Sequence, residues 1–171
     1  MDHLLSVCRT CFEAGVAAAD PAAALRRAMA RRAVMQAAAG KTALIAVGKA
    51  AAPMMREALL HLAPDQALLV TNYENAVEID GVICHAAGHP TPDQAGAEAA
   101  AAIISILEGL GAGDHVILLL SGGGSALIPA PVDGGSLANK SAVYDLMLAI
   151  GAPSDFIFMV LKRRAQIGRG S

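Results

Sequence analysis

Four short apolar runs, separated by longer segments with helical spacing, dominate the pattern of this 171-residue chain. Each run is five or six residues long, and glycine or a polar residue follows within two positions: 42–47, 67–71, 82–86 and 115–120. Runs without a regular polar alternation are typical of strands that are buried on both faces, as in parallel sheets. The pattern therefore predicts four buried strands.

Apolar residues recur every three or four positions between and outside these runs, which predicts helices. We expect them at 4–19, 21–36, 49–61, 91–109 and 136–150. Asp20 can cap the second helix because Pro21 follows it, and Thr91 can cap the fourth with Pro92 in its first turn. Strands that alternate with helices predict an α/β fold, a Rossmann-like parallel sheet flanked by helices.

The composition raises one further question, namely whether the chain spans a membrane. The chain is 55% hydrophobic with a mean hydropathy of +0.50. No apolar run approaches the roughly 20 residues that a bilayer requires, so we expect no membrane span. The start, Met1 to His3, carries no basic cluster ahead of an apolar segment, which argues against a signal peptide. The expected location is the cytoplasm.

Charge and cysteine content limit the kinds of partner and of cysteine chemistry that the chain can have. A net charge of -2 and 3% aromatic residues argue against nucleic acid and favour small molecules. We expect Cys8, Cys11 and Cys84 to be buried, reduced thiols, because their setting resembles neither a redox motif nor a zinc site. The sequence assigns no metal ligands.

The segment Ser121-Gly122-Gly123-Gly124-Ser125 follows the last predicted strand directly. Three glycines leave the backbone bare, so that a ligand can approach the main-chain N–H groups, and phosphate suits this geometry best. The alternative is a turn that serves only tight packing between a strand and a helix. We favour the anion cradle, because three glycines cost conformational entropy unless something must come close.

Ligands of open parallel sheets bind at the carboxyl ends of the strands, where three predicted turns should converge. Gly48 and Lys49 form the first, Gly88 to Pro90 the second, and 121–125 the third. The Lys49 ammonium could neutralise charge on a transferring phosphoryl group or hold a carboxylate. The less favoured alternative is a solvated lysine, because the first turn of a helix is an unfavourable place for a cation. His89, held by the following proline and four residues before Asp93, is a binding candidate or a structural histidine.

Three sequence motifs are incomplete. Gly40-Lys41-Thr42 lacks the first glycine of a Walker A loop and precedes a strand, and 109–113 lies at the wrong end of the sheet for a dinucleotide fingerprint. A nucleophile elbow would need glycine where Leu127 stands, so the sequence disfavours a serine hydrolase.

Taken together, three motifs resemble those of the glycerate 2-kinase family, whose members have a MOFRL-type C-terminal domain and are often labelled hydroxypyruvate reductase. The resemblance covers about residues 4–151. The motifs are Val47-Gly48-Lys49-Ala50-Ala51-Ala52-Pro53-Met54, Gly88-His89-Pro90-Thr91-Pro92-Asp93 and Leu120-Ser121-Gly122-Gly123-Gly124-Ser125-Ala126-Leu127.

This resemblance implies ATP-dependent phosphorylation of glycerate at its 2-hydroxyl, assisted by Mg²⁺ or another divalent cation. It implies a catalytic role for Lys49. The residues that would bind nucleotide or substrate are Gly48, His89, Asp93, Ser121, Gly122, Gly123, Gly124 and Ser125. Which turn takes the nucleotide and which takes glycerate stays open.

The resemblance ends after Pro153, where family members continue with an asparagine and a basic stretch. We expect residues 1–152 to form part of an N-terminal α/β domain, and we interpret 153–171 as a divergent tail, a truncated or frame-shifted end. A short membrane-touching helix is the less favoured reading of the tail. If a second lobe is missing, catalysis by this chain is doubtful, and the exposed apolar surface should promote self-association.

Two alternatives to the kinase are a non-catalytic nucleotide- or phosphate-binding module and a hydroxypyruvate reductase. The reductase is disfavoured because the chain lacks a dinucleotide fingerprint.

Overall fold

The computed structural model describes residues 2–31, 40–130 and 136–151. The predicted tail at 153–171 and the last part of the predicted helix 21–36 lie outside the described residues. Within them the four predicted strands form one sheet: β1 (Thr42–Val47), β2 (Gln66–Asn72), β3 (Ile83–Ala87) and β4 (His115–Leu120). The order is β3-β2-β1-β4 and every pairing is parallel, which confirms the α/β prediction.

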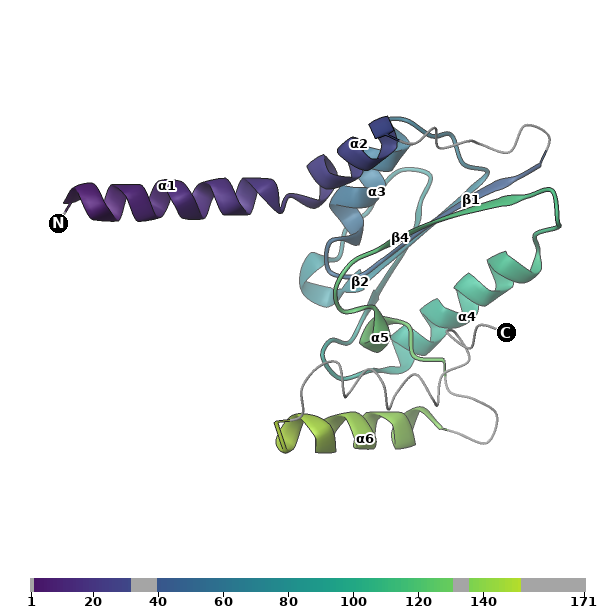
Figure 1. Ribbon diagram of the computed structural model, residues 1–171. Coiled ribbons are helices and arrows are strands. Elements are labelled where there is room, and N and C mark those ends of the chain that lie inside the picture. The colour runs from purple at the N-terminus through teal and green to yellow at the C-terminus, as the bar shows by residue number, and fades with distance from the viewer. Residues whose placement is uncertain (1, 32–39, 131–135, 152–171) are drawn as a thin grey trace.

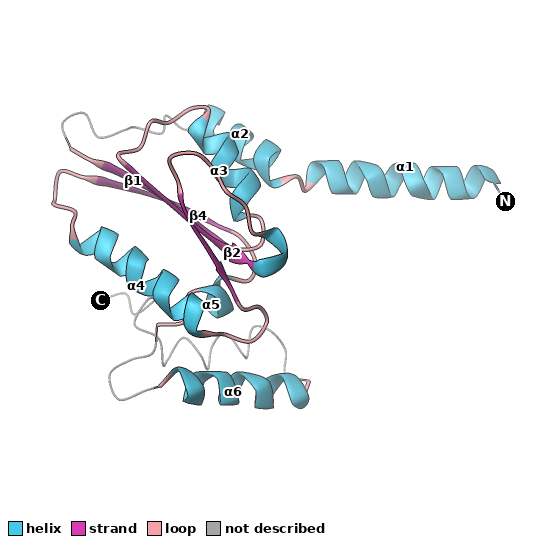
Figure 2. Ribbon diagram, turned by 180° about the vertical axis from the view of Figure 1, so that it is seen from behind, coloured by secondary structure: helices cyan, strands magenta, loops and turns pink. Residues whose placement is uncertain are grey.

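Helices cover both faces of this sheet, as Figures 1 and 2 show. Helices α2 (Pro21–Arg31) and α3 (Ala51–Leu59) lie on one face, and α4 (Gln94–Glu108) and the short α5 (Gly124–Leu127) lie on the other. The 3₁₀ turn η1 (Tyr73–Asn75) follows β2, and α6 (Leu137–Ala149) lies beyond α5. Helix α1 (Asp2–Ala18) projects from the body of the domain (Figure 1).

Strand β1 is the centre of the core, and all six of its residues are buried. Its side chains alternate between the two faces, as the pleat of a strand requires. Leu44 and Ala46 pack towards α3, whereas Ile45 and Val47 pack towards α4 and α5. A strand that is buried on both sides explains why its sequence is apolar throughout.

The start of α4 differs from the prediction. Asp93, and not Thr91, caps the helix: its carboxylate accepts a hydrogen bond of 2.9 Å from the Gly96 N–H. The Thr91 hydroxyl instead donates to the carboxylate of Asp145 in α6, at 3.0 Å. By contrast, Asp20 caps α2 as predicted, with its carboxylate 2.6 Å from the Ala23 N–H.

The expected burial of the N-terminal cysteines is wrong. Cys8 and Cys11 are exposed, because α1 extends away from the sheet, and Cys84 on β3 is partly buried. The described helices also include none that is both long and apolar enough to span a membrane.

An ion pair fastens α2 to α3. The Arg26 guanidinium donates two hydrogen bonds, of 2.8 and 2.6 Å, to the Glu57 carboxylate, and His61 lies 3.0 Å from the same carboxylate. Glu57 is buried, whereas Arg26 is largely exposed. The hydrogen bonds from Arg26 and then from His61 lower the pKa of Glu57 from 4.5 to about 2.

A carboxyl group whose pKa falls on folding stabilises the folded state above its unfolded pKa and loses that contribution as the pH drops towards its folded pKa. Replacing Glu57 with Gln should therefore lower the urea midpoint at neutral pH. The difference from wild type should shrink between pH 4.5 and about 2. Glu108→Gln, at an exposed position, is the control and should show no such pH-dependent gap. A gap for Glu57→Gln that stays constant with pH contradicts this account.

Candidate functional site

Two of the predicted turns are tied together at the carboxyl ends of β1 and β4. The Lys49 N–H donates to the Gly122 carbonyl at 2.9 Å, and the Ser121 N–H donates to the Val47 carbonyl at 2.9 Å. Lys49 lies in the turn before α3, not in its first helical turn, because the helix begins at Ala51. The backbone therefore places Lys49 beside the glycine-rich turn.

Gly48 is required by the close approach of Ser121. Its φ is +125°, and a Cβ at this position would lie 2.1 Å from the Ser121 hydroxyl oxygen. That hydroxyl accepts a hydrogen bond of 3.0 Å from the Ala50 N–H and lies 3.4 Å from the Val47 carbonyl. Gly48 and Ser121 thus hold the two turns together, and the Ser121 side chain is already occupied within the protein.

The turn at 88–90 joins the other two at Gly123. This glycine has a φ of +100°, and a Cβ there would lie 3.0 Å from Cδ2 of His89, 3.2 Å from its Nε2 and 3.4 Å from Cγ of Lys49. The imidazole and the lysine chain therefore flank Gly123. The three turns converge as the sequence predicts.

Neither the backbone conformation nor a close contact among the described residues requires glycine at positions 122 and 124. Neither has a positive φ, a Cβ on Gly122 would have no atom within 4 Å, and one on Gly124 would make an ordinary contact with Val47 at 3.6 Å. In addition, the N–H groups of Gly122 and Gly123 donate no hydrogen bond within the described part of the chain. Ser125 lies in the first turn of α5. The turn thus offers bare, unused donors next to a cation.

The carboxylate of Asp93 is occupied by hydrogen bonds within the protein. Besides capping α4, its carboxylate accepts a hydrogen bond of 2.5 Å from the Tyr73 hydroxyl. Burial acts to raise the pKa of Asp93, but the hydrogen bonds from Tyr73 and from the N–H groups of Gly88 and Gly96 outweigh it and lower the pKa. Asp93 therefore fixes the loop that carries His89.

Sequence reasoning missed the role of η1, which braces the site from the side of β2. The Asn75 amide donates to the Lys49 carbonyl at 3.2 Å and to the Asn72 side-chain oxygen at 2.7 Å. Tyr73, from the same turn, holds Asp93. The available signal was the run of polar residues directly after β2, since such residues collect at the strand ends where sites form.

His89 lies between opposite charges. Burial and the positive charge of Lys49 lower its pKa, while the negative charge of Glu74 acts in the opposite direction. The net result is a lowered pKa, which favours the neutral form of the imidazole near neutral pH. A neutral imidazole can accept a hydrogen bond from a hydroxyl group.

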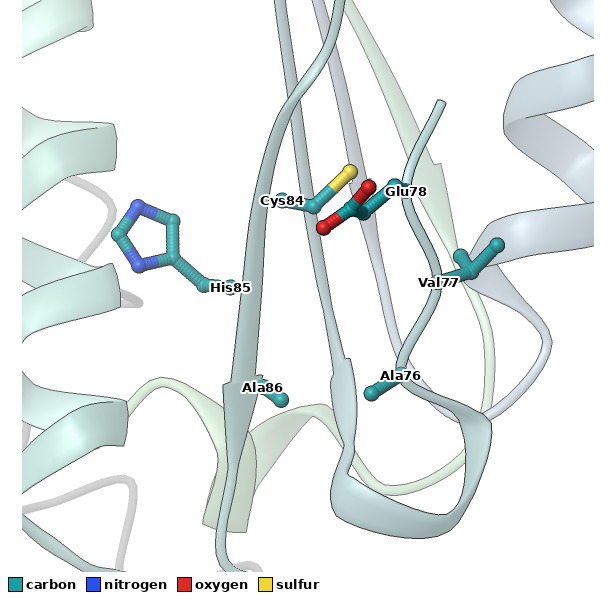
Figure 3. Close-up of a pocket in the computed structure, with 6 residues that line it drawn as sticks. All are labelled: Ala76, Val77, Glu78, Cys84, His85 and Ala86. Carbon is teal, nitrogen blue, oxygen red and sulfur yellow. The ribbon is translucent and has the colours of Figure 1, made fainter. Parts of the chain in front are cut away.

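A cavity of about 330 Å³ lies elsewhere, between residues 76–78 and strand β3. Figure 3 shows Glu78 and Cys84 close to each other there, with the His85 ring directed to the other side of the strand. None of the predicted site residues lines this cavity. The described residues also contain no group of three or more His, Cys, Asp or Glu side chains that could hold a metal ion.

Comparison with known proteins gives a consistent result. The family model described as "Domain of unknown function (DUF4147)" matches residues 7–171. The chain is 35% identical, over 96% of its length, to an Agrobacterium vitis protein whose name provisionally assigns it to hydroxypyruvate reductase. It is 37% identical, over 77% of its length, to the glycerate 2-kinase of Pyrococcus horikoshii.

Among solved structures, the crystal structure of the Thermotoga maritima glycerate kinase is similar over 98% of this chain, with a TM-score of 0.83 and 28% identity. The chain spans only part of the length of all three: 37%, 30% and 40%, respectively.

The charges around His89 predict how its titration should respond to substitution. Lys49→Met removes a positive neighbour and should raise the pKa of His89, while Glu74→Gln should lower it further. Nuclear magnetic resonance titration of the imidazole protons measures both shifts. Lys41→Met, at the opposite end of β1, is the control and should leave His89 unchanged. If His89 titrates identically in the Lys49 variant, the two side chains are not neighbours.

Proposed function

We propose, on the premise that the chain belongs to the DUF4147 family, that it carries the phosphate-binding part of a glycerate kinase site. The proposed reaction is the ATP-dependent phosphorylation of glycerate at its 2-hydroxyl. The relatives named glycerate kinase support this assignment, and their greater length makes the activity of this chain alone a separate question.

The main support for the proposal is that the main-chain N–H groups of Gly122 and Gly123, beside Lys49, donate no hydrogen bond within the described residues. Two N–H groups that have no partner among the described residues, and an open side at Gly122, suit the approach of a phosphate group. Phosphoryl transfer depends on positioning and on neutralisation of charge more than on covalent chemistry by the protein. The chain supplies main-chain donors and an ammonium group at one place.

Within this proposal the residues divide into two groups. The N–H groups of Gly122 and Gly123 bind a phosphate of ATP, and Lys49 neutralises negative charge on the transferred phosphoryl group. His89, whose lowered pKa favours the neutral imidazole, accepts a hydrogen bond from a substrate hydroxyl. Gly48, Ser121 and Asp93 act indirectly, because their contacts hold these groups in place.

Divalent cations enter the proposal only with the nucleotide. Mg²⁺ commonly binds through substrate phosphates and one or two carboxylates, and it offsets their negative charge. The described residues provide no three-ligand acidic cluster. We therefore expect Mg²⁺ to arrive as the ATP complex, and no step depends on a cation site built by this chain.

Calorimetry with Mg-ATP tests the cradle. Gly122→Ala should weaken binding by at least about tenfold, since the methyl group would occupy the open side where the phosphate approaches. Gly113→Ala is the matched control: its Cβ also meets nothing within 4 Å, but it lies at the other end of the sheet. Equal binding by both variants and the wild type would contradict the cradle.

A coupled assay for ADP formation with Mg-ATP and D-glycerate tests catalysis. Lys49→Ala should reduce the rate on the order of 100-fold, as loss of a charge-stabilising group does, whereas Lys41→Ala should not. If the chain binds ATP but shows no Lys49-dependent turnover, it is a phosphate-binding module without catalysis.

A further inference from the structure

The 3₁₀ turn η1 lies between the two turns that carry Lys49 and His89. Strand β2 is the neighbour of both β1 and β3, and the three strands run parallel. Lys49 follows β1, η1 follows β2, and His89 follows β3. The turns that leave neighbouring parallel strands lie side by side at one end of the sheet. This position allows η1 to contact both of the other turns.

The carbonyl group of Lys49 depends on a donor from η1. The helical pattern of α3 offers it none, because the residue four positions later is Pro53, which has no N–H. Within the described residues, the hydrogen bond to this carbonyl comes from the side-chain amide of Asn75, at 3.2 Å. The Lys49 N–H donates to the Gly122 carbonyl at 2.9 Å. Both polar groups of the Lys49 backbone are therefore held.

The amide of Asn75 is itself oriented by a buried neighbour. Its nitrogen also donates to the side-chain oxygen of Asn72, at 2.7 Å, and Asn72 is only 7% exposed. The Thr71 hydroxyl lies 3.3 Å from the same oxygen, and the Asn72 amide nitrogen donates to the Glu74 carboxylate. The oxygen of Asn72 thus faces Asn75, which directs the donor side of the Asn75 amide towards Lys49.

The first residue of η1 holds the turn on the other side. The Tyr73 hydroxyl donates to the Asp93 carboxylate, which also accepts a hydrogen bond from the N–H of Gly88. Gly88 directly precedes His89 in the chain. The three residues of η1 therefore contact the turns on both sides, one through Tyr73 and the other through Asn75.

We propose that Asn75 is a positioning residue for Lys49. Its amide fixes the Lys49 backbone, so that the lysine side chain stays beside Gly123 and across from His89. Asn75 acts through Lys49 and is not itself a catalytic residue. The effect on phosphate binding rests on the proposed function, whereas the effect on the position of Lys49 does not.

The titration of His89 in the full chain, followed by nuclear magnetic resonance of its imidazole protons, tests this role without any ligand. Burial and the positive charge of Lys49 lower the pKa of His89. Asn75→Ala and Asn75→Leu both remove the donor, release Lys49 and should raise the pKa of His89, by no more than Lys49→Met does.

Asn139→Leu, at an exposed position in α6, is the matched control and should leave the titration of His89 unchanged. The two Asn75 variants differ in size but not in the lost donor. An unchanged pKa of His89 in both overturns the proposal. So does a change in only one of them, because it would indicate packing and not the hydrogen bond.

A double variant tests whether Asn75 acts through Lys49. In the Lys49→Met background, Asn75→Leu should cause no further shift in the pKa of His89, because the charge that it positions is already gone. A shift of the same size in that background would come from another charge, such as Glu74, and would overturn the proposal.

A titration with inorganic phosphate carries the test to the ligand. Asn75→Leu should weaken binding about two- to tenfold, the range expected for the loss of one hydrogen bond, and no more than Lys49→Met does. If Lys49→Met weakens binding and Asn75→Leu does not, the proposal is wrong. If Lys49→Met binds phosphate as the wild type does, the proposed function fails, and the His89 titrations still decide the role of Asn75.

Discussion

The candidate site depends on the close approach of Gly48 to Ser121. The carboxyl ends of β1 and β4 are neighbours in the sheet, and the chain must leave both strands in the same small space. Only a residue without a side chain fits at position 48, because a Cβ would lie 2.1 Å from the Ser121 hydroxyl oxygen. Once the two turns meet in this way, the Lys49 N–H bonds to the Gly122 carbonyl, and the lysine is held beside the glycine-rich turn.

This constraint divides the residues of the site into two groups: those that hold the turns in place and those whose polar groups remain available to a ligand. Ser121, Asp93 and Asn75 use their polar side chains on other parts of the protein. The N–H groups of Gly122 and Gly123 have no such use in the part of the chain that the structure describes. Donors that are fixed in advance bind an anion without the cost of reorganisation, which is the property that phosphoryl transfer requires.

Much of this arrangement could be predicted from the sequence, for identifiable reasons. Strand β1 is apolar because it lies inside the sheet and is covered on both faces, and that signal is local. The prediction that all four strands are buried is wrong for β4, an edge strand of the described sheet whose Val116, Leu118 and Leu120 are exposed. The convergence of Gly48, His89 and Gly123 follows from parallel topology alone. The predictions that were wrong concern features that depend on contacts between residues far apart in the sequence. Thr91 and Asp93 are both good caps, and Asp93 caps α4 while it also binds the Tyr73 hydroxyl and the Gly88 N–H.

The two cysteines of α1 show the same limit. The periodicity of the helix correctly gives an apolar face, but periodicity cannot tell which surface covers that face, and the domain does not. The turn η1 was missed because a polar stretch after a strand is typical of any loop. Its contacts to Lys49 and Asp93 exist only in three dimensions.

The measurement that tests the central claim most directly is a titration of the isotope-labelled chain with inorganic phosphate, followed by the backbone amide resonances. The account predicts saturable shifts at Gly122 and Gly123, with accompanying shifts at Lys49 and His89. Shifts confined to the cavity beside Glu78 and Cys84, or no saturable shift at the glycine-rich turn, would contradict it.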